Sequence, residues 1–185
     1  MPNPLALDRW ISQLWEPLAA YGGRLNPDPL DAVAVVLHRR DAVPGDLSLP
    51  VGSRGLAIFA LKPNGSYVRR VLAERMLPCV QCLGTLNRDP AAVPFDIDFI
   101  DGKLSVGWIG NADGLLAVRL TIAWDAQREA YALVADDVAR SDPLTGIQTR
   151  RIRDFVSGRQ IENGETIAIV RRFIPLESVS ADDYR

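Results

Sequence analysis

Between residues 95 and 140 the chain alternates apolar and polar positions, a period of two that is typical of antiparallel strands with one buried face. In FDIDFIDGKLSVGWIG (residues 95–110) the alternation runs up to Asp101-Gly102 and resumes after it. An Asp-Gly pair suits the two positive φ angles of a type I′ turn, so the sequence predicts a hairpin here. A second strand pair is expected over residues 115–125 and 130–140, around the turn AQRE.

Shorter apolar runs bounded by Pro, Gly, Asn and Asp predict further strands over residues 31–39, 56–61, 66–74, 147–156 and 166–176. The segment SGRQIENGE (residues 157–165) is expected to link the last two strands. No helix long enough for a parallel βαβ crossover is expected after residue 30. The expected fold is all-β, mainly an antiparallel meander that forms a propeller-like stack or a sandwich over residues 30–176, within a single domain of residues 1–185.

One N-terminal α-helix is expected before this β-rich core, within residues 1–23. Apolar side chains recur there at three- and four-residue steps, as they do on one buried helix face: Leu7, Trp10, Ile11, Leu14, Trp15 and Leu18. Asn3 is a candidate N-cap with Pro4 at the first helical position, and Pro17 should end or kink the helix.

Composition places the chain among globular proteins and excludes few functions. It has 185 residues, of which 48% are hydrophobic and 24% charged, enough for one well-buried core. The net charge of -2 gives no indication of binding to nucleic acid or to an anionic membrane. Charged residues interrupt the N-terminal apolar run, so no signal peptide is expected, and a cytoplasmic location is predicted, or a periplasmic one if a signal peptide has been removed.

The two cysteines, Cys79 and Cys82, have a C-x-x-C spacing that admits several roles. A structural zinc site needs about four Cys or His ligands, and His38 is the only histidine, so no metal site is expected from this pair. The flanking sequence lacks the strand–helix context of a thioredoxin-type pair. A structural role on the loop before the central hairpin is predicted, either as a disulfide or as two reduced thiols.

Two sets of acidic residues raise the possibility of metal or acid–base chemistry. Asp96 and Asp98 alternate on one strand face and could serve a small metal-dependent enzyme, although an outer solvated face opposite Phe95, Ile97 and Phe99 explains them better. Asn26, Asp28 and Asp31 resemble part of a calcium loop, but the prolines between them favour an Asx-capped turn. No catalytic residue, cofactor or metal is therefore predicted.

Arginine-rich strands are the best surface signal. An arginine-lined surface can bind an acidic protein partner, and nearby acidic residues can match basic groups on it. The candidate partner-binding residues are Arg69, Arg150, Arg151, Arg153, Arg171, Asp136 and Asp137.

The order of several segments resembles a known family. The segments are LDAVAVVL, GLAIFALKPNGSYV, CVQCLGTLNRDP, IDFIDGKLSVGW, VRLTIAWDAQREAYALVADDVARSDPLTG and DFVSGRQI, which span most of residues 30–176. Together they are similar to bacterial proteins with a degenerate integrin-type (FG-GAP/VCBS-like) β-propeller. Thr85 departs from the family pattern, in which a second Gly follows the C-x-x-C segment.

Some members of that group resemble lysozyme-inhibitor-like immunity proteins. The resemblance therefore implies a non-enzymatic binding protein, an immunity-type inhibitor that occludes a cognate bacterial toxin or secreted effector. It also implies that Cys79 and Cys82 clip the loop before the central hairpin. The alternatives are a small metal-dependent enzyme that uses Asp96 and Asp98, or a structural subunit of a secretion or phage assembly that self-associates. The oligomeric state is left open.

Overall fold

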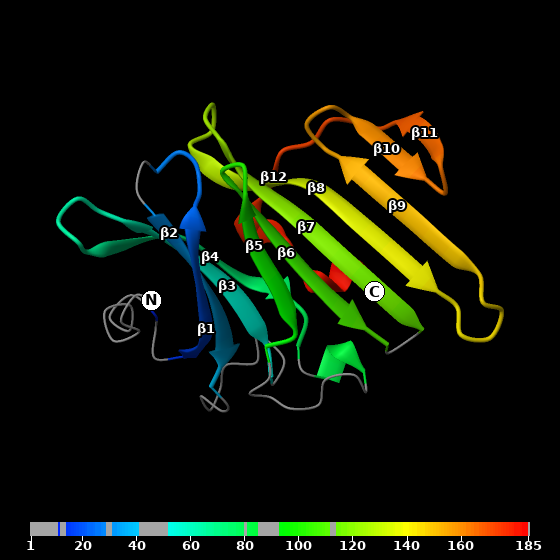
Figure 1. Ribbon diagram of the computed structural model, residues 1–185, viewed down its shortest axis with the longest axis horizontal. Coiled ribbons are helices and arrows are strands. Elements are labelled where there is room, and N and C mark those ends of the chain that lie inside the picture. Colours follow the sequence, from blue (N-terminus) through cyan, green and yellow to red (C-terminus); the bar gives the residue numbers. More distant parts are fainter. Residues whose placement is uncertain are drawn as a thin grey trace.

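A computed structural model describes residues 11, 14–28, 31–40, 52–79, 81–84, 93–111 and 114–184. Within these ranges the chain is built from antiparallel strands arranged in two sheets, with short 3-10 turns and no closed barrel (Figure 1). The all-β prediction is therefore confirmed. None of the helical turns in this part of the chain is long and apolar enough to cross a membrane.

The small sheet has the strand order β1-β2-β3-β4. Its strands are β1 (Trp15–Arg24), β2 (Asp31–Arg39), β3 (Arg54–Leu61) and β4 (Tyr67–Leu77). The two central strands, β2 and β3, are apolar almost throughout because both of their faces are buried. Ala34, Val36 and Ile58 point into the core between the sheets, whereas Val35 and Phe59 belong to a second apolar cluster that includes Trp15.

The large sheet has the order β11-β10-β9-β8-β7-β6-β5, with β12 paired to β8. Its strands are β5 (Phe95–Ile100), β6 (Lys103–Gly110), β7 (Leu115–Asp125), β8 (Ala130–Ser141), β9 (Gln148–Asp154), β10 (Arg159–Glu162), β11 (Glu165–Ala168) and β12 (Ile174–Pro175). The turn predicted at Asp101-Gly102 is confirmed, because the two residues have φ angles of 51° and 71°.

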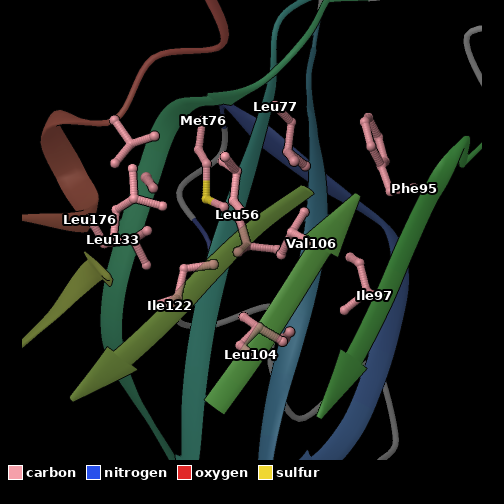
Figure 2. Packing of buried hydrophobic residues seen from close by; sticks show 14 of the residues in the cluster. Leu56, Met76, Leu77, Phe95, Ile97, Leu104, Val106, Ile122, Leu133 and Leu176 are labelled. Atoms are coloured by element: carbon pink, nitrogen blue, oxygen red, sulfur yellow. The ribbon is translucent and has the colours of Figure 1, made fainter. Parts of the chain in front are cut away.

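The core fills the space between the two sheets. Figure 2 shows Leu56 and Met76 of the small sheet close to Leu104, Val106 and Ile122 of the large sheet. All of these side chains are fully buried. Burial of apolar surface contributes about 25 cal/mol per Å², so this interface is the main source of stability for the described part of the chain.

The C-terminal segment closes the inner face of the large sheet beyond the small one. It consists of β12 and the 3-10 turns η4 (Leu176–Ser178) and η5 (Ala181–Tyr184), which lie behind β6–β8 in Figure 1. Leu176 and Tyr184 are buried in the core cluster, and the ring of Tyr184 meets that of Trp108 edge-on at 6.0 Å. The outer face of the large sheet is left uncovered by this segment.

The predicted N-terminal helix is wrong within the described residues. Trp15–Arg24 forms strand β1, paired antiparallel with β2, and this part of the chain contains no α-helix. Pro17 cannot donate a helical hydrogen bond but is tolerated on an edge strand, where the register shifts between Pro17 and Ala19. Residues 1–10, 12 and 13, which include the candidate N-cap Asn3 and the apolar residues Leu7 and Trp10 of the helical pattern, lie outside the described residues.

The C-terminal strands also differ in part from the prediction. The segment expected to be a linker contains β10, and the strand expected over residues 166–176 is divided into β11 and β12. Asn163 and Gly164 form a tight turn with φ angles of 48° and 94°, so β10 and β11 make a short hairpin that the apolar pattern alone did not reveal.

Candidate functional site

The candidate site lies on the outer face of the large sheet, where strand register brings charged side chains into one row. Asp96 pairs with Gly107, Gly107 with Arg119, and Arg119 with Asp137 across β5, β6, β7 and β8. Successive side chains of a strand point to opposite faces, so these positions lie outward while their neighbours Phe95, Ile97 and Val106 fill the core. The row therefore combines residues that are far apart in sequence.

Ion pairs connect this row. The Arg119 guanidinium donates to the Asp96 carboxylate at 2.6 Å and to the Ser105 hydroxyl at 3.0 Å. The Arg150 guanidinium donates two bonds to Asp137, from Nε at 2.9 Å and from Nη2 at 2.6 Å. The bond to Asp137 raises the pKa of Arg150 above its ordinary value. Bidentate geometry of this kind fixes the direction of a guanidinium group.

Next to the charged row lies a row of small and apolar residues. Ile109 pairs with Ala117, Ala117 with Ala139, and Ala139 with Arg150. Because Gly107 and the two alanines project little, the sheet surface is hollowed into a groove of about 760 Å³. We define the sheet groove by these lining residues: Asp96, Gly107, Ile109, Leu115, Ala117, Arg119, Asp137, Ala139 and Arg150.

Two apolar side chains of the sheet groove are exposed although they lie over a well-packed sheet. Ile109 is 53% exposed and Leu115 51% exposed. A neighbouring hollow of about 500 Å³ shares Leu115 with the groove and extends it over β8 and β9 toward Asn163. The outer face thus offers an apolar strip beside a row of fixed charges.

The charged groups of the sheet groove are paired with one another and are partly exposed. Each carboxylate, that of Asp96 and that of Asp137, is already bonded to an arginine. The exposed guanidinium edges and the apolar strip remain accessible to a ligand, since Arg119 and Arg150 are 50% and 62% exposed.

A second acid–arginine pair lies on the opposite, inner face of the sheet. The Arg153 Nη2 donates to Asp136 at 2.5 Å, and its Nε lies 3.0 Å and 3.2 Å from the two carboxylate oxygens. The Asp136 side chain has no exposed surface, and that of Arg153 is 24% exposed. Burial, followed by the nearby Asp136 charge, raises the pKa of Tyr184, while the bond to Asp136 raises that of Arg153.

The structure divides the predicted partner-binding residues among several places. It brings Asp137 and Arg150 together in the sheet groove. It puts Asp136 and Arg153 on the inner face with Arg151, whose buried Nε has no hydrogen-bond partner among the described residues. Arg69 lies on β4 of the small sheet, and Arg171 follows β11, with its Nε 3.3 Å from the Ser157 carbonyl. These residues do not form one surface.

Sequence reasoning missed most of the sheet groove. Arg119, Leu115 and Ile109 gave no signal of their own, because single polar or apolar residues in a strand are common. The alternation of apolar and polar residues in β5 to β8 could have predicted that these positions face outward, but only once the strand register is known.

Cys79 and Cys82 form a disulfide within the connection between β4 and β5. The backbone N–H of Cys82 also donates to the Cys79 carbonyl at 3.0 Å, and the 3-10 turn η3 (Gln81–Leu83) follows. Leu83 at the end of this turn is buried, and its carbonyl accepts from Asn111 at 3.1 Å. The disulfide thus lies in a loop that is joined to the end of β6 through the Leu83–Asn111 hydrogen bond.

Asn26 and Asp28, from the predicted Asx-rich turn, contact residues of both sheets. The Asn26 N–H donates to the Gly102 carbonyl at 3.0 Å, at the tip of the β5–β6 hairpin. The nearly buried Asp28 carboxylate pairs with Arg70 and lies 3.4 Å from the Tyr131 hydroxyl. Among the described residues, no three His, Cys, Asp or Glu side chains gather closely enough to hold a metal ion.

Comparison with known proteins finds no match, whether with family models, with curated proteins or with solved structures. The resemblance to propeller-type immunity proteins therefore stays a prediction.

Proposed function

We propose that this chain is a non-enzymatic protein-binding domain and that the sheet groove is its contact surface. The observation that carries the proposal is the exposed apolar strip of Ile109 and Leu115, set beside two arginines whose directions are fixed by carboxylates. Protein interfaces commonly combine an apolar centre with arginine anchors and a polar rim.

The charges of the sheet groove indicate the kind of contact. Asp96, Arg119, Asp137 and Arg150 alternate in sign and balance one another. A strongly basic or acidic ligand would gain little from such a surface, whereas a protein segment with an apolar side chain flanked by charges of both signs would match it. The occupant we propose is therefore a loop or strand of a partner protein.

The finer hypothesis concerns the identity of the partner. An immunity-type inhibitor would hold a bacterial toxin inactive by covering its active cleft. The resemblance described above supports this class of partner, and the open sheet face is suited to steric occlusion. In this hypothesis the toxin contributes the segment that enters the sheet groove.

The test uses tagged protein as bait in a lysate of its native host, with three baits in parallel. The first is the wild type. The second is Ala117→Arg, which places a long charged side chain over the small-residue floor. The matched control is Ala126→Arg, at an exposed position of the β7–β8 turn outside the groove. We expect one stoichiometric partner with the wild type and the control, and its loss with A117R.

The captured partner is then purified and its affinity measured against the same three proteins and Leu115→Ala. We expect L115A to weaken binding about tenfold or more, as an apolar anchor does. A partner that binds A117R as tightly as the wild type would refute the groove as the contact surface. Absence of any stoichiometric partner would refute the binding-domain proposal, and a partner that is harmless when expressed alone would refute the toxin hypothesis.

A further inference from the structure

The free edge of the large sheet lies at β11. In Figure 1 this strand is the outermost of the sheet, next to β10 and far from the small sheet. All four of its residues are exposed. The other sheet edges in the described part of the chain are covered to some extent, since β5 lies beside β1 and β4 contacts η4.

The register shows which backbone groups of β11 point outward. Asn163-Gly164 is a two-residue turn, so the flanking Glu162 and Glu165 form a hydrogen-bonded pair within the hairpin. Hydrogen-bonded and non-hydrogen-bonded pairs alternate along an antiparallel ladder, so the backbone groups of Ile167 also bond to β10. The N–H of Ile169 points to the same side, since it donates to the Gly158 carbonyl at 2.9 Å.

The N–H and C=O groups of the intervening β11 residues, Thr166 and Ala168, therefore point away from β10. None of them takes part in a further backbone hydrogen bond within the described residues. They form a row of donors and acceptors that another strand can pair with.

Nothing in the sequence of this edge prevents such pairing. Residues 165–170 read ETIAIV, which contains no proline, no lysine and many residues that favour strands. Ile167 is 45% exposed and Val170 is 72% exposed. An open edge with exposed apolar side chains is the usual site of strand addition between chains.

We propose that residues 165–171, which are β11 and the three residues that follow it, pair antiparallel with the same residues of a second copy of this chain, about a two-fold axis at Ala168. In this register the outward backbone groups of Ala168 meet those of Ala168 in the second copy, and Thr166 faces Val170 of the second copy, just beyond the end of β11. Ile167 then lies opposite Ile169 of the second copy on the inner face. Glu165 lies opposite Arg171 of the second copy.

The charge match argues for a second copy over an unrelated strand. Several two-fold registers are possible along this edge, and the one centred on Ala168 places Glu165 opposite Arg171 of the second copy. Because the contact is symmetric, this ion pair occurs twice in the dimer. Arg171 is exposed, and only its Nε is bonded, to the Ser157 carbonyl at 3.3 Å, among the described residues. Within its own hairpin Glu165 faces another acid, Glu162, so an arginine opposite it relieves repulsion.

The experiment measures the mass of the intact chain in solution by sedimentation equilibrium, from low micromolar to several hundred micromolar. We expect a monomer–dimer equilibrium. Glu165→Arg or Arg171→Glu should each raise the dimer dissociation constant about tenfold or more, because each exchanges two attractive cross-strand pairs for two repulsive ones. The double variant E165R/R171E restores both pairs with reversed sign, and its dissociation constant should return to within about threefold of the wild type.

Two further variants locate the contact. Ala168→Pro removes an outward N–H without breaking the β10–β11 ladder, and it should abolish the dimer while circular dichroism stays unchanged. Arg172→Glu makes the same charge change as R171E at a position that faces no acid in this register, and it should leave the dimer constant within about twofold.

A monomer at every concentration would overturn the proposal. So would a dimer that persists in A168P, a double variant no tighter than the single ones, or a series of larger oligomers, because a two-fold edge contact closes on itself.

Discussion

Asp136→Ala and Asp137→Ala form a matched pair that tests how burial changes the contribution of an ion pair. The two residues are adjacent on β8, and each bonds an arginine of β9. Asp136 reaches Arg153 on the inner face, whereas Asp137 reaches Arg150 on the outer face. Sequence position, residue type and partner type are thus nearly the same, and exposure is the main difference.

The expected magnitudes follow from the exposed fractions. The Asp136 side chain is 0% exposed and that of Arg153 is 24% exposed, so D136A leaves a largely buried guanidinium without its carboxylate. Breaking a buried pair in this way costs about 3–5 kcal/mol, and we expect about 3 kcal/mol because Arg153 keeps some contact with water. Asp137 and Arg150 are 30% and 62% exposed, and D137A should cost about 0.5 kcal/mol.

Equilibrium urea unfolding at neutral pH measures both free energies, with far-ultraviolet circular dichroism to confirm the native fold. A double variant, Asp136→Leu with Arg153→Leu, supplies the control: it removes both charges, so it should be more stable than D136A. Equal effects of D136A and D137A, or a double variant less stable than D136A, would refute the reasoning that the stranded charge dominates.

Two further predictions concern pH and backbone conformation. Burial raises the pKa of Tyr131 and Tyr184 above the ordinary 10.0. Above about pH 10 these tyrosines therefore ionise in the unfolded chain before they ionise in the folded one. Their contribution to the free energy of unfolding is full below pH 10 and is lost as the pH rises further. Urea unfolding between about pH 9 and about pH 11 should show a fall of up to about 1.4 kcal/mol per pH unit for each tyrosine, and unchanged stability would contradict this. Gly102 has a φ of 71°, and an added Cβ would lie 2.6 Å from the Asn26 amide, whereas Gly65 has a φ of 78° and open space around it. Thermal unfolding should therefore show a loss of about 1 kcal/mol for Gly65→Ala and clearly more for Gly102→Ala, and equal losses would contradict the close approach.

Strands with a period-two pattern were predicted well from the sequence. The bounds of β7 (Leu115–Asp125) agree with the prediction, as do those of β2, because their apolar runs end at polar turn residues. The β5–β6 hairpin follows directly from the Asp-Gly turn flanked by alternation. Here local conformation and burial favour the same structure, so local reasoning is sufficient.

The N-terminal segment shows where local reasoning fails. Trp15 and Leu18 fit a helical spacing, but a short run of apolar residues also fits a strand, and the decision depends on what lies beside it. In the fold, Trp15–Arg24 pairs with β2, and Trp15 packs with Val35 and Phe59. This tertiary pairing decides between two structures that the local pattern alone allows.

The candidate site could be predicted only in part, since it depends on register between distant strands. Asp136 and Asp137 look equivalent in sequence, yet period two sends one into the core and the other into the sheet groove. The pairing of β7 with β8 shifts by one residue between Thr121 and Ile122. If the inward and outward positions of β8 are counted from the β7–β8 turn without this shift, Asp136 and Asp137 are each assigned to the wrong face of the sheet. Strand pairs, not composition, decide which arginine meets which acid.

The two proposed surfaces have a joint consequence that follows from sheet geometry. Pairing at β11 sets inner-face residues opposite inner-face residues, such as Ile167 opposite Ile169 of the second copy, so both outer faces lie on the same side of a continuous sheet. The two sheet grooves would then open in one direction. A dimeric or surface-bound partner could occupy both grooves, and its apparent affinity would exceed that for one groove without any new contact. Ala168→Pro should remove this gain and leave the affinity of a single groove unchanged, whereas Ala117→Arg should remove binding and leave the dimer intact. The two surfaces are therefore separable by mutation, and each variant is a control for the other.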